Sequence, residues 1–287
     1  MLIVFNPAAG ERRAERLWRV LDLLVNNGIR IELVETAHRG HATILAREAA
    51  GRGARLIVAA GGDGTIAEVA NGLSGIAARL GVIPLGTANV LAHELGLPFA
   101  PRAVAAALAF GRTRTIWPGL AQSPAGERLF VQMLGAGFDA AVVHHLPEPL
   151  KRAFGRGAYV AQCLREIVRY RFPRLLLRLD GSECEAASVI VSKGRYYAGR
   201  YLLAPCARPD ERGFSVAVFR GPGAFSALLG GALLPLNLLP RAPGLSLIRA
   251  RTIEIENAAP AQADGDAAGL SPLSVTDAPW PIAIVSG

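Results

Sequence analysis

Residues 56–65 read Leu-Ile-Val-Ala-Ala-Gly-Gly-Asp-Gly-Thr, an apolar run that leads directly into a glycine-rich turn. The run Leu56 to Ala60 contains no polar residue and is typical of a buried strand, and the apolar spacing from Thr65 to Leu73 predicts a helix. Glycine lets a backbone approach a bound group closely. A helix that starts after such a turn directs its unpaired N–H groups at that group. The stretch therefore predicts a strand, an anion-binding turn and a helix.

The same alternation of strand and helix runs through the first hundred residues. Strand character is found at Leu2 to Phe5, Ile29 to Val34, Leu56 to Ala60 and Leu80 to Pro84, and helical spacing at Arg12 to Asn26, His41 to Gly51, Thr65 to Leu73 and Thr87 to Leu95. This alternation predicts an α/β domain with a parallel sheet and helices on both faces. The loops after parallel strands gather at one edge of the sheet, where such folds bind ligands.

After about Trp117 the pattern changes to short strands with turn signals such as Asp180-Gly181. The expected strands are Leu129 to Leu134, Leu175 to Leu179, Ala186 to Ser192, Phe214 to Phe219, Leu245 to Asn257 and Ile282 to Val285. Helices are expected at Ala158 to Tyr170 and Ala224 to Leu234, and a loop at Ala258 to Gly269. We therefore expect an α/β nucleotide-binding domain over residues 1–117 and a β-rich domain over residues 118–271, with the segment 272–287 returning to the first domain.

The composition favours an anionic partner. The formal net charge is +8, and Lys151 and Lys193 are the only lysines. Such a charge is typical of proteins that bind nucleotides, phospholipid surfaces or nucleic acid, although a bias towards arginine equally reflects a GC-rich genome. The three cysteines form no C-x-x-C pair, which argues against a disulfide framework and a zinc site.

The apolar segments predict a cytoplasmic protein. The first apolar run stops at Asn6-Pro7 and has no basic leader, so it predicts a strand and not a signal peptide. The longest apolar stretch, Phe225 to Leu239, is too short to span a bilayer and contains Pro235. A core helix is the default interpretation of that stretch, and a surface that admits a lipid tail is the alternative.

Three glycine-containing loops follow strands of the first domain. They are Asn6 to Gly10, Gly61 to Thr65 and Pro84 to Asn89. Each loop alone is explained by an ordinary strand-to-helix turn, but three at one sheet edge favour a phosphate site. Thr65 and Thr87 stand where a hydroxyl caps a helix or contacts phosphate.

The phosphate site has no lysine available to it. The sequence contains no G-K-[ST] motif and no lysine in its first 150 residues, so this is not a P-loop. The charge of a phosphate must therefore be met by backbone N–H groups, a divalent metal or arginine. Asp63 would repel phosphate in such a loop, so it requires a Mg²⁺ link or a capping hydrogen bond.

The motifs N-P-x-x-G, G-G-D-G-T and P-L-G-T-A-N, at Asn6, Gly61 and Pro84, resemble the catalytic domain of diacylglycerol kinases and the related bacterial, sphingosine and ceramide kinases. Residues 135–140, GAGFDA, and Asp264-Gly265-Asp266 extend the resemblance into the second domain. The resemblance implies an N-terminal domain that binds ATP with Mg²⁺, a C-terminal β-sandwich, and a reactive site in the cleft between them.

The resemblance and the three loops together give the expected nucleotide contacts. These are Asn6, Gly10, Thr36, Gly61, Gly62, Asp63, Gly64, Thr65, Ile66, Ala67, Gly86, Thr87 and Asn89, and Asp63 is also expected to act in catalysis through the Mg²⁺ of the nucleotide.

The second domain departs from the family pattern at two positions. The family has D-G-E in its catalytic loop, with the glutamate as general base, and Asp266 replaces that glutamate here. An oriented aspartate still accepts a proton from a hydroxyl, so Asp266 is expected to be catalytic, and a simple Asp-Gly turn is the alternative. Many members hold a structural Mg²⁺ in an Asp-Gly segment, but Arg212 stands at the ligand position, which leaves Asp210 and Glu211 as doubtful ligands.

These observations predict an ATP-dependent lipid kinase whose acceptor is diacylglycerol or a related lipid alcohol. The basic and aromatic segment Lys151 to Arg178 suits peripheral contact with an anionic inner membrane face, and a solvated helix face explains it equally. An edge strand of the second domain suits a homodimer, and no nucleic-acid partner is expected. Two alternatives stay open: an NAD kinase, for which no acidic ribose-binding loop is found, and a nucleotide- or lipid-binding protein with lost catalysis.

Overall fold

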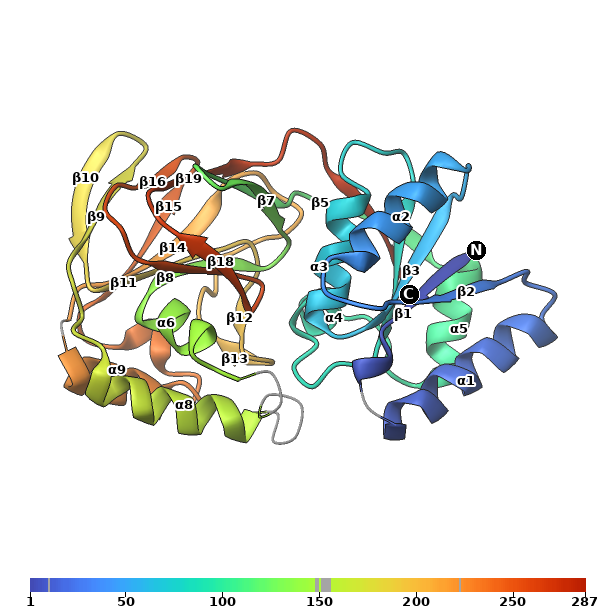
Figure 1. Ribbon diagram of the computed structural model, residues 1–287, viewed down its shortest axis with the longest axis horizontal. Coiled ribbons are helices and arrows are strands. Elements are labelled where there is room, and N and C mark those ends of the chain that lie inside the picture. Colours follow the sequence, from blue (N-terminus) through green and yellow to red (C-terminus); the bar gives the residue numbers. More distant parts are fainter. Residues whose placement is uncertain (10, 148–149, 151–155, 222) are drawn as a thin grey trace. The chain divides into compact units, whose positions relative to one another are not determined.

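The computed structural model describes residues 1–287 except residues 10, 148–149, 151–155 and 222 (Figure 1). The chain divides into two compact units, of which the first comprises Met1–Trp117 and Pro279–Gly287 and the second Pro118–Ala278. The chain returns to the first unit at Pro279 and not near residue 272, because Leu273–Asp277 forms a strand (β19) of the second unit.

A six-stranded sheet organises the first unit. Its order is β2-β1-β3-β4-β20-β5, and its strands are parallel except for β5, which is antiparallel to β20. The strands are β1 (Leu2–Phe5), β2 (Glu32–Glu35), β3 (Leu56–Gly61), β4 (Arg79–Pro84), β5 (Arg112–Ile116) and β20 (Ile282–Ser286). The order places the ends of β1, β3 and β4 side by side at one edge.

Helices cover both faces of this sheet. They are α1 (Glu11–Asn26), α2 (His41–Gly51), α3 (Asp63–Gly72), α4 (Val90–Glu94) and α5 (Pro101–Phe110), and a short 3-10 helix η1 (Pro7–Ala9) precedes α1. Val58 packs with α1 and α5 in one core, whereas its neighbour Ile57, also fully buried, points to the opposite face, where α2 and α3 contact the strands. The predicted α/β architecture is confirmed.

In the first unit, α3 and α4 start two or more residues away from the position that the sequence predicts. Helix α3 starts at Asp63, before the expected Thr65, and an acidic residue in a first turn is favourable to the helix dipole. Helix α4 is limited to Val90–Glu94 because Asn89 adopts a left-handed conformation with φ 46°. Thr87 therefore lies in the loop and not in the helix.

Two six-stranded antiparallel sheets form the second unit. Their orders are β10-β9-β16-β19-β6-β7 and β15-β14-β11-β8-β17-β18. The strands are β6 (Gly119–Ser123), β7 (Gly126–Phe130), β8 (Met133–Gly137), β9 (Leu175–Leu179), β10 (Ser182–Ala186), β11 (Ser188–Ser192), β14 (Phe214–Phe219), β15 (Leu245–Ala250), β16 (Ile253–Ile255), β17 (Pro260–Ala263), β18 (Asp266–Leu270) and β19, and β12 (Tyr196–Tyr197) pairs with β13 (Tyr201–Leu202) separately. Leu177 and Ile253 of one sheet share a buried core with Val189 and Val216 of the other, which confirms the predicted sandwich.

Several predictions for this unit are wrong. The segment Leu245 to Asn257 is not one strand, because β15 and β16 belong to different sheets. The segment Leu129 to Leu134 spans the end of β7 and the start of β8. The expected loop Ala258 to Gly269 is a hairpin of β17 and β18, whose small residues lack the apolar alternation that marks most strands.

Within its described residues, the second unit contains three α-helices. Helix α6 (Phe138–His144) follows β8, and α8 (Arg156–Arg169) contacts both α6 and α9 (Gly223–Leu233), which is followed by the 3-10 helix η2 (Leu239–Arg241). The interpretation of the Phe225 stretch as a core helix is wrong, because no residue of α9 is buried. No helix within the described residues is both long and apolar enough to cross a bilayer.

Candidate active site

The first loop at the strand edge is bound to the second by a side-chain hydrogen bond. Asn6, which follows β1, donates from Nδ2 to Oγ1 of Thr65 at 3.1 Å and accepts the N–H of Ala8 at its Oδ1. Thr65 is buried inside α3, and the residue that precedes the helix is Gly62, so the Thr65 hydroxyl is not a helix cap. Asn6 and Thr65 therefore join two of the predicted loops. Gly10 lies outside the described residues.

The second and third loops approach each other through two glycines. A Cβ atom on Gly86 would lie 2.5 Å from the Cα of Gly62 and 2.6 Å from Oδ1 of Asn89, so no larger residue fits without a shift of backbone. Asn89 donates from Nδ2 to the Gly86 carbonyl at 2.8 Å. Its Oδ1 is buried and has no hydrogen-bond partner among the described residues. A buried acceptor without a partner at this edge is suited to a bound group.

Asp63 lies where two helices begin. Its Oδ1 accepts the N–H of Leu91, in the first turn of α4, at 3.4 Å. The positive ends of α3 and α4 both favour a carboxylate at this position. The negative charge of Asp63, for which the sequence requires a partner, is therefore stabilised by backbone groups of two helices.

The structure shows which atoms of the other predicted nucleotide contacts are available to a ligand. Ile66 and Ala67 are buried, so only their backbones could meet a ligand, and the N–H of Ile66 already bonds the Gly62 carbonyl at 3.1 Å. Gly61 and Gly64 are at the end of β3 and in the first turn of α3. Thr87 is exposed in the third loop, and Thr36 continues β2 through a bond from its N–H to the Phe5 carbonyl.

Two residues of the first unit were missed by the sequence analysis. The Glu68 carboxylate accepts the N–H groups of Gly40 and Ala42 at 2.8 and 3.1 Å, and so holds the loop that carries Thr36 against α3. Arg16 of α1 is exposed and donates to the carbonyl of Pro84, the first residue of the third loop, at 3.3 Å. One general indication of this role is present in the sequence: the first N–H groups of a helix such as α2 need an acceptor, which Glu68 supplies.

A two-residue turn in the second unit carries Asp264 of the Asp-Gly-Asp motif, and Asp266 is the first residue of β18. Asp264 and Gly265 have φ of 51° and 82° between the paired residues Ala263 and Asp266, which is the hairpin turn that Asp-Gly favours. The predicted Asp-Gly turn is present. Both carboxylates are partly buried, and Asp266 lies 3.8 Å from Arg128.

The Asp264 carboxylate is held by the turn between β7 and β8. It accepts the N–H groups of Val131, Gln132 and Met133 at 2.7, 2.8 and 3.0 Å. Burial raises the pKa of Asp264 to about 6, although these three hydrogen bonds oppose the shift. From the sequence, Asp264 was identified only as a member of the Asp-Gly-Asp motif. Its position in the structure makes it a candidate for proton transfer in addition to Asp266.

A hydrogen-bond chain fixes the turn to the GAGFDA segment. Gln262 accepts the N–H of Gly265 at its Oε1 and donates from Nε2 to Asp139 at 2.8 Å. Asp139 also accepts from the hydroxyl of Tyr197, and burial raises the pKa of the Asp139 carboxyl. A Cβ atom on Gly135 would lie 2.5 Å from Asp139 Oδ2. Residues of the GAGFDA segment therefore position the Asp264-Gly265 turn.

Glu211 and Asp210, the two metal ligands considered for the second unit, form an ion pair and lie exposed to solvent, respectively. The Glu211 carboxylate pairs with Arg249 at 2.6 Å, and Asp210 is exposed. Within the described residues, no group of three histidine, cysteine, aspartate or glutamate side chains is arranged to hold a metal ion.

Comparisons with known proteins identify two domain families along the chain. The diacylglycerol kinase catalytic domain matches residues 1–120, and the YegS C-terminal NAD kinase beta sandwich-like domain matches residues 132–286. "Probable lipid kinase YegS-like" of Pseudomonas putida is 33% identical over 72% of this chain and 72% of its own length, and "Probable lipid kinase YegS" of Escherichia fergusonii is 29% identical over 79% and 77%.

A solved structure shares the fold. The crystal structure of a diacylglycerol kinase from Bacillus anthracis aligns with a TM-score of 0.75 at 22% identity, over 100% of this chain and 96% of that chain.

Proposed function

Because the chain belongs to the YegS family of diacylglycerol kinase-like lipid kinases, which transfer phosphate to an alcohol, we propose that it phosphorylates diacylglycerol or a related lipid alcohol with MgATP. The observation that carries the ATP part is the approach of the Gly62 and Gly86 backbones where α3 begins, with the unpartnered Oδ1 of Asn89 beside them as an acceptor for the metal ion of MgATP. A phosphate group fits where two backbones meet without side chains and helices begin.

In the proposed reaction, the first unit binds and orients the nucleotide. The N–H groups at the start of α3 and the guanidinium of Arg16 supply positive charge that lysine supplies in other phosphate sites. Asp63 and the Oδ1 of Asn89 would hold the Mg²⁺ of the nucleotide, which neutralises charge on the transferred phosphate when bound. Glu68 keeps Thr36 and its loop in place.

The second unit has the task of activating the acceptor hydroxyl. Asp264 takes the proton of the hydroxyl as the hydroxyl oxygen attacks the γ-phosphorus of ATP and the bond from that phosphorus to the leaving ADP breaks. A base whose pKa is near the working pH is the most effective in this role. The Oδ2 of Asp264 accepts one N–H, from Val131, so that oxygen keeps a lone pair for the substrate. Asp266, the base expected from sequence, is the competing candidate, and its carboxylate lies 3.8 Å from the guanidinium of Arg128.

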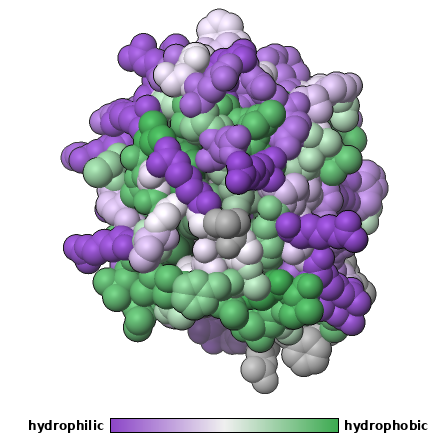
Figure 2. Space-filling view, turned by 90° about the vertical axis from the view of Figure 1, so that its left-hand side faces the viewer, coloured by the Kyte–Doolittle hydropathy of each residue, from purple (hydrophilic) through white to green (hydrophobic). Residues whose placement is uncertain are grey.

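An apolar face on α8 and α9 supports access to a bilayer. Val160, Leu164 and Val168 of α8 are 62%, 55% and 86% exposed and recur at every fourth residue, and Phe225 of α9 is 77% exposed. Figure 2 shows apolar side chains gathered along the lower part of the face where these helices lie. We call this set, with Leu228 and Leu236, the α8–α9 face.

The occupant we propose for the α8–α9 face is an anionic membrane surface. Arg165, Arg169 and Arg171 are exposed beside the apolar stripe of α8, and α9 carries no charge. Apolar side chains flanked by arginine suit the interface of a bilayer with anionic headgroups. The substrate of a lipid kinase resides in such a surface. Lys151 and Phe154 of the predicted basic segment lie outside the described residues.

One experiment tests the function against its alternatives. The protein is incubated with labelled ATP, Mg²⁺ and a panel of diacylglycerol, sphingosine, ceramide and NAD. Label in the phosphate ester of a lipid is the expected result, and the Asp63→Asn variant should keep its fold and lose the transfer. Labelled NADP would replace the proposal with an NAD kinase, and ATP binding without transfer would replace it with a binding protein.

A separate measurement tests the membrane surface. Val168→Asp places a charge in the α8–α9 face and should weaken sedimentation with phosphatidylglycerol vesicles by roughly fivefold. Val25→Asp is the matched control, because Val25 is 54% exposed on α1 of the first unit. Equal binding of the two variants would contradict the proposed surface.

A further inference from the structure

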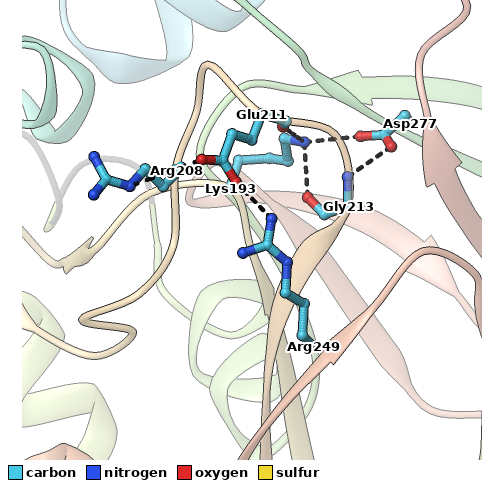
Figure 3. A network of polar contacts seen from close by, with 6 residues as sticks. All are labelled: Lys193, Arg208, Glu211, Gly213, Arg249 and Asp277. Atoms are coloured by element: carbon cyan, nitrogen blue, oxygen red, sulfur yellow. Dashed lines mark hydrogen bonds and ion pairs between the residues drawn. The ribbon is translucent and has the colours of Figure 1, made fainter.

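Lys193 is a fully buried basic residue of the second unit. Its side chain has 0% exposure, and its ammonium donates to the carbonyls of Glu211 and Gly213 at 3.0 and 2.9 Å and to Oδ1 of Asp277 at 2.8 Å. Figure 3 shows these three oxygens around the nitrogen, while the Glu211 carboxylate extends away towards Arg249. All three N–H donors of the ammonium therefore have an oxygen acceptor.

The residues around the ammonium come from both sheets of the sandwich. Lys193 follows β11, the 211–213 segment leads into β14 of the same sheet, and Asp277 is the last residue of β19 in the opposite sheet. Asp277 also accepts the N–H of Gly213 at its Oδ2 at 2.7 Å. Gly213 has φ of 87°, a conformation that favours glycine. The ammonium therefore fastens one loop to both sheets.

The set of acceptors is the set that hard cations prefer. Two backbone carbonyls and one carboxylate are oxygen ligands of the kind that hold Mg²⁺ or Ca²⁺. The face of the Phe214 ring, whose centroid lies 4.7 Å from Nζ, adds a further attraction for positive charge. Burial lowers the pKa of Lys193, and Asp277 counteracts that shift by stabilising the charged form.

The structural Mg²⁺ that the family resemblance implies does not fit this segment. An ammonium already fills the space between the Glu211 and Gly213 carbonyls and Asp277, and two cations cannot share it. The side chains of Asp210 and Glu211 do not turn towards that space, because Asp210 is exposed and Glu211 pairs with Arg249.

We propose that Lys193 is a built-in structural cation that fills the position of a bound metal ion, and that removal of its amine leaves a site that takes a divalent cation from solution. The second unit then folds independently of divalent ions as long as Lys193 is present. The same oxygens bind either the ammonium or the metal, because each satisfies two carbonyls and neutralises one carboxylate.

The test is thermal unfolding of the full chain with EDTA, Mg²⁺ or Ca²⁺. In EDTA, Lys193→Ala should lower the unfolding midpoint by roughly 10 °C, because it leaves the largely buried carboxylate of Asp277 without its charged partner. Either metal should restore several degrees to this variant and leave the wild type unchanged. Arg249→Ala is the matched control, because it removes an exposed arginine of the same network and should stay insensitive to metal.

Three outcomes would overturn the proposal. One is a Lys193→Ala variant as stable as the wild type, and another is a destabilised variant that neither metal restores. The third is a loss of stability of the wild type in EDTA. This third outcome can be measured even if no Lys193 variant folds. Lys193→Met, whose side chain ends one atom short of the ammonium position and so keeps most of the packing, provides a second variant with the same expected dependence on metal.

Discussion

Two Asp-Gly hairpins in the second unit have the same turn conformation, but the pKa values of their aspartates are shifted in opposite directions. Asp180-Gly181 joins β9 to β10 with φ of 47° and 84°, and Asp264-Gly265 joins β17 to β18 with φ of 51° and 82°. Each carboxylate accepts backbone N–H groups from a neighbouring segment, Asp180 from Arg251 and Thr252 at 2.9 and 2.8 Å. The local chain conformation is therefore nearly equal.

The pKa values differ because the surroundings differ. Hydrogen bonds from the backbone of Thr252 and Arg251 lower the pKa of the exposed Asp180. Burial raises the pKa of Asp264 to about 6 in spite of three such bonds. The comparison teaches that an Asp-Gly motif specifies a turn, whereas the packing around it specifies whether its carboxylate can exchange a proton near neutral pH.

The largest expected effect is on turnover. Asp264→Asn keeps a residue that tolerates a positive φ but removes the proposed base, so turnover should fall by about 100-fold or more. Asp180→Asn makes the same change in the matching turn and should stay within about twofold of the wild type. Steady-state rates of lipid phosphorylation measure both, and equal losses in the two variants would refute the distinction.

The second prediction concerns stability against pH. The pKa of Asp264 is raised in the folded state, from 3.8 to about 6, so its favourable contribution is present below the lower value and lost as the pH rises through about 6. The free energy of unfolding of the wild type relative to Asp264→Asn should therefore decrease by roughly 2–3 kcal/mol from about pH 4 to pH 7.

The Asp180 variant should behave in the opposite sense. The pKa of Asp180 is lowered, so its contribution is present above its unfolded value and lost as the pH falls. The difference between the wild type and Asp180→Asn should stay constant above about pH 5. Urea unfolding at a series of pH values measures both differences, and parallel curves for the two variants would contradict the assignment of the raised pKa to Asp264.

A smaller effect is expected at Asp266. Asp266→Asn removes the partner of Arg128 but leaves the Asp264 carboxylate, so we expect a loss of turnover of roughly tenfold. Rates of this variant and of Asp264→Asn, measured side by side, rank the two carboxylates. A greater loss at Asp266 would return the role of base to the residue expected from sequence.

The smallest effect concerns the glycines of the two turns. Gly265→Ala and Gly181→Ala each force alanine into a positive φ and should cost roughly 1 kcal/mol of stability. Gly181 has open space around it, and the nearest atom to a Cβ on Gly265 is the Tyr159 hydroxyl at 3.9 Å. Thermal unfolding should therefore give similar losses, and a much larger loss at Gly265 would mean that the turns themselves differ.

The first unit could be predicted from sequence because its site is built from short contiguous motifs. The runs before Asn6, Gly61 and Gly86 give both the parallel sheet and the edge where the loops meet. The contacts that refine this site, such as Glu68 with Gly40, join residues 28 apart, and no local pattern marks them.

The second unit was harder to predict because its decisive contacts are long-range. Asp264 bonds a turn about 130 residues earlier in the chain, and Lys193 meets Asp277, 84 residues away. The hairpin of β17 and β18 was missed because alanine and glycine give no apolar alternation. Helix α9 was misassigned to the core because an apolar composition does not distinguish a buried helix from an exposed one.

The pH dependence of kcat tests most directly the claim that burial makes Asp264 the base. Turnover is measured at saturating MgATP and diacylglycerol for the wild type and for Asp180→Asn. We predict that kcat falls below about pH 6 in both proteins, following protonation of Asp264. A kcat that stays constant down to about pH 5 would contradict the account.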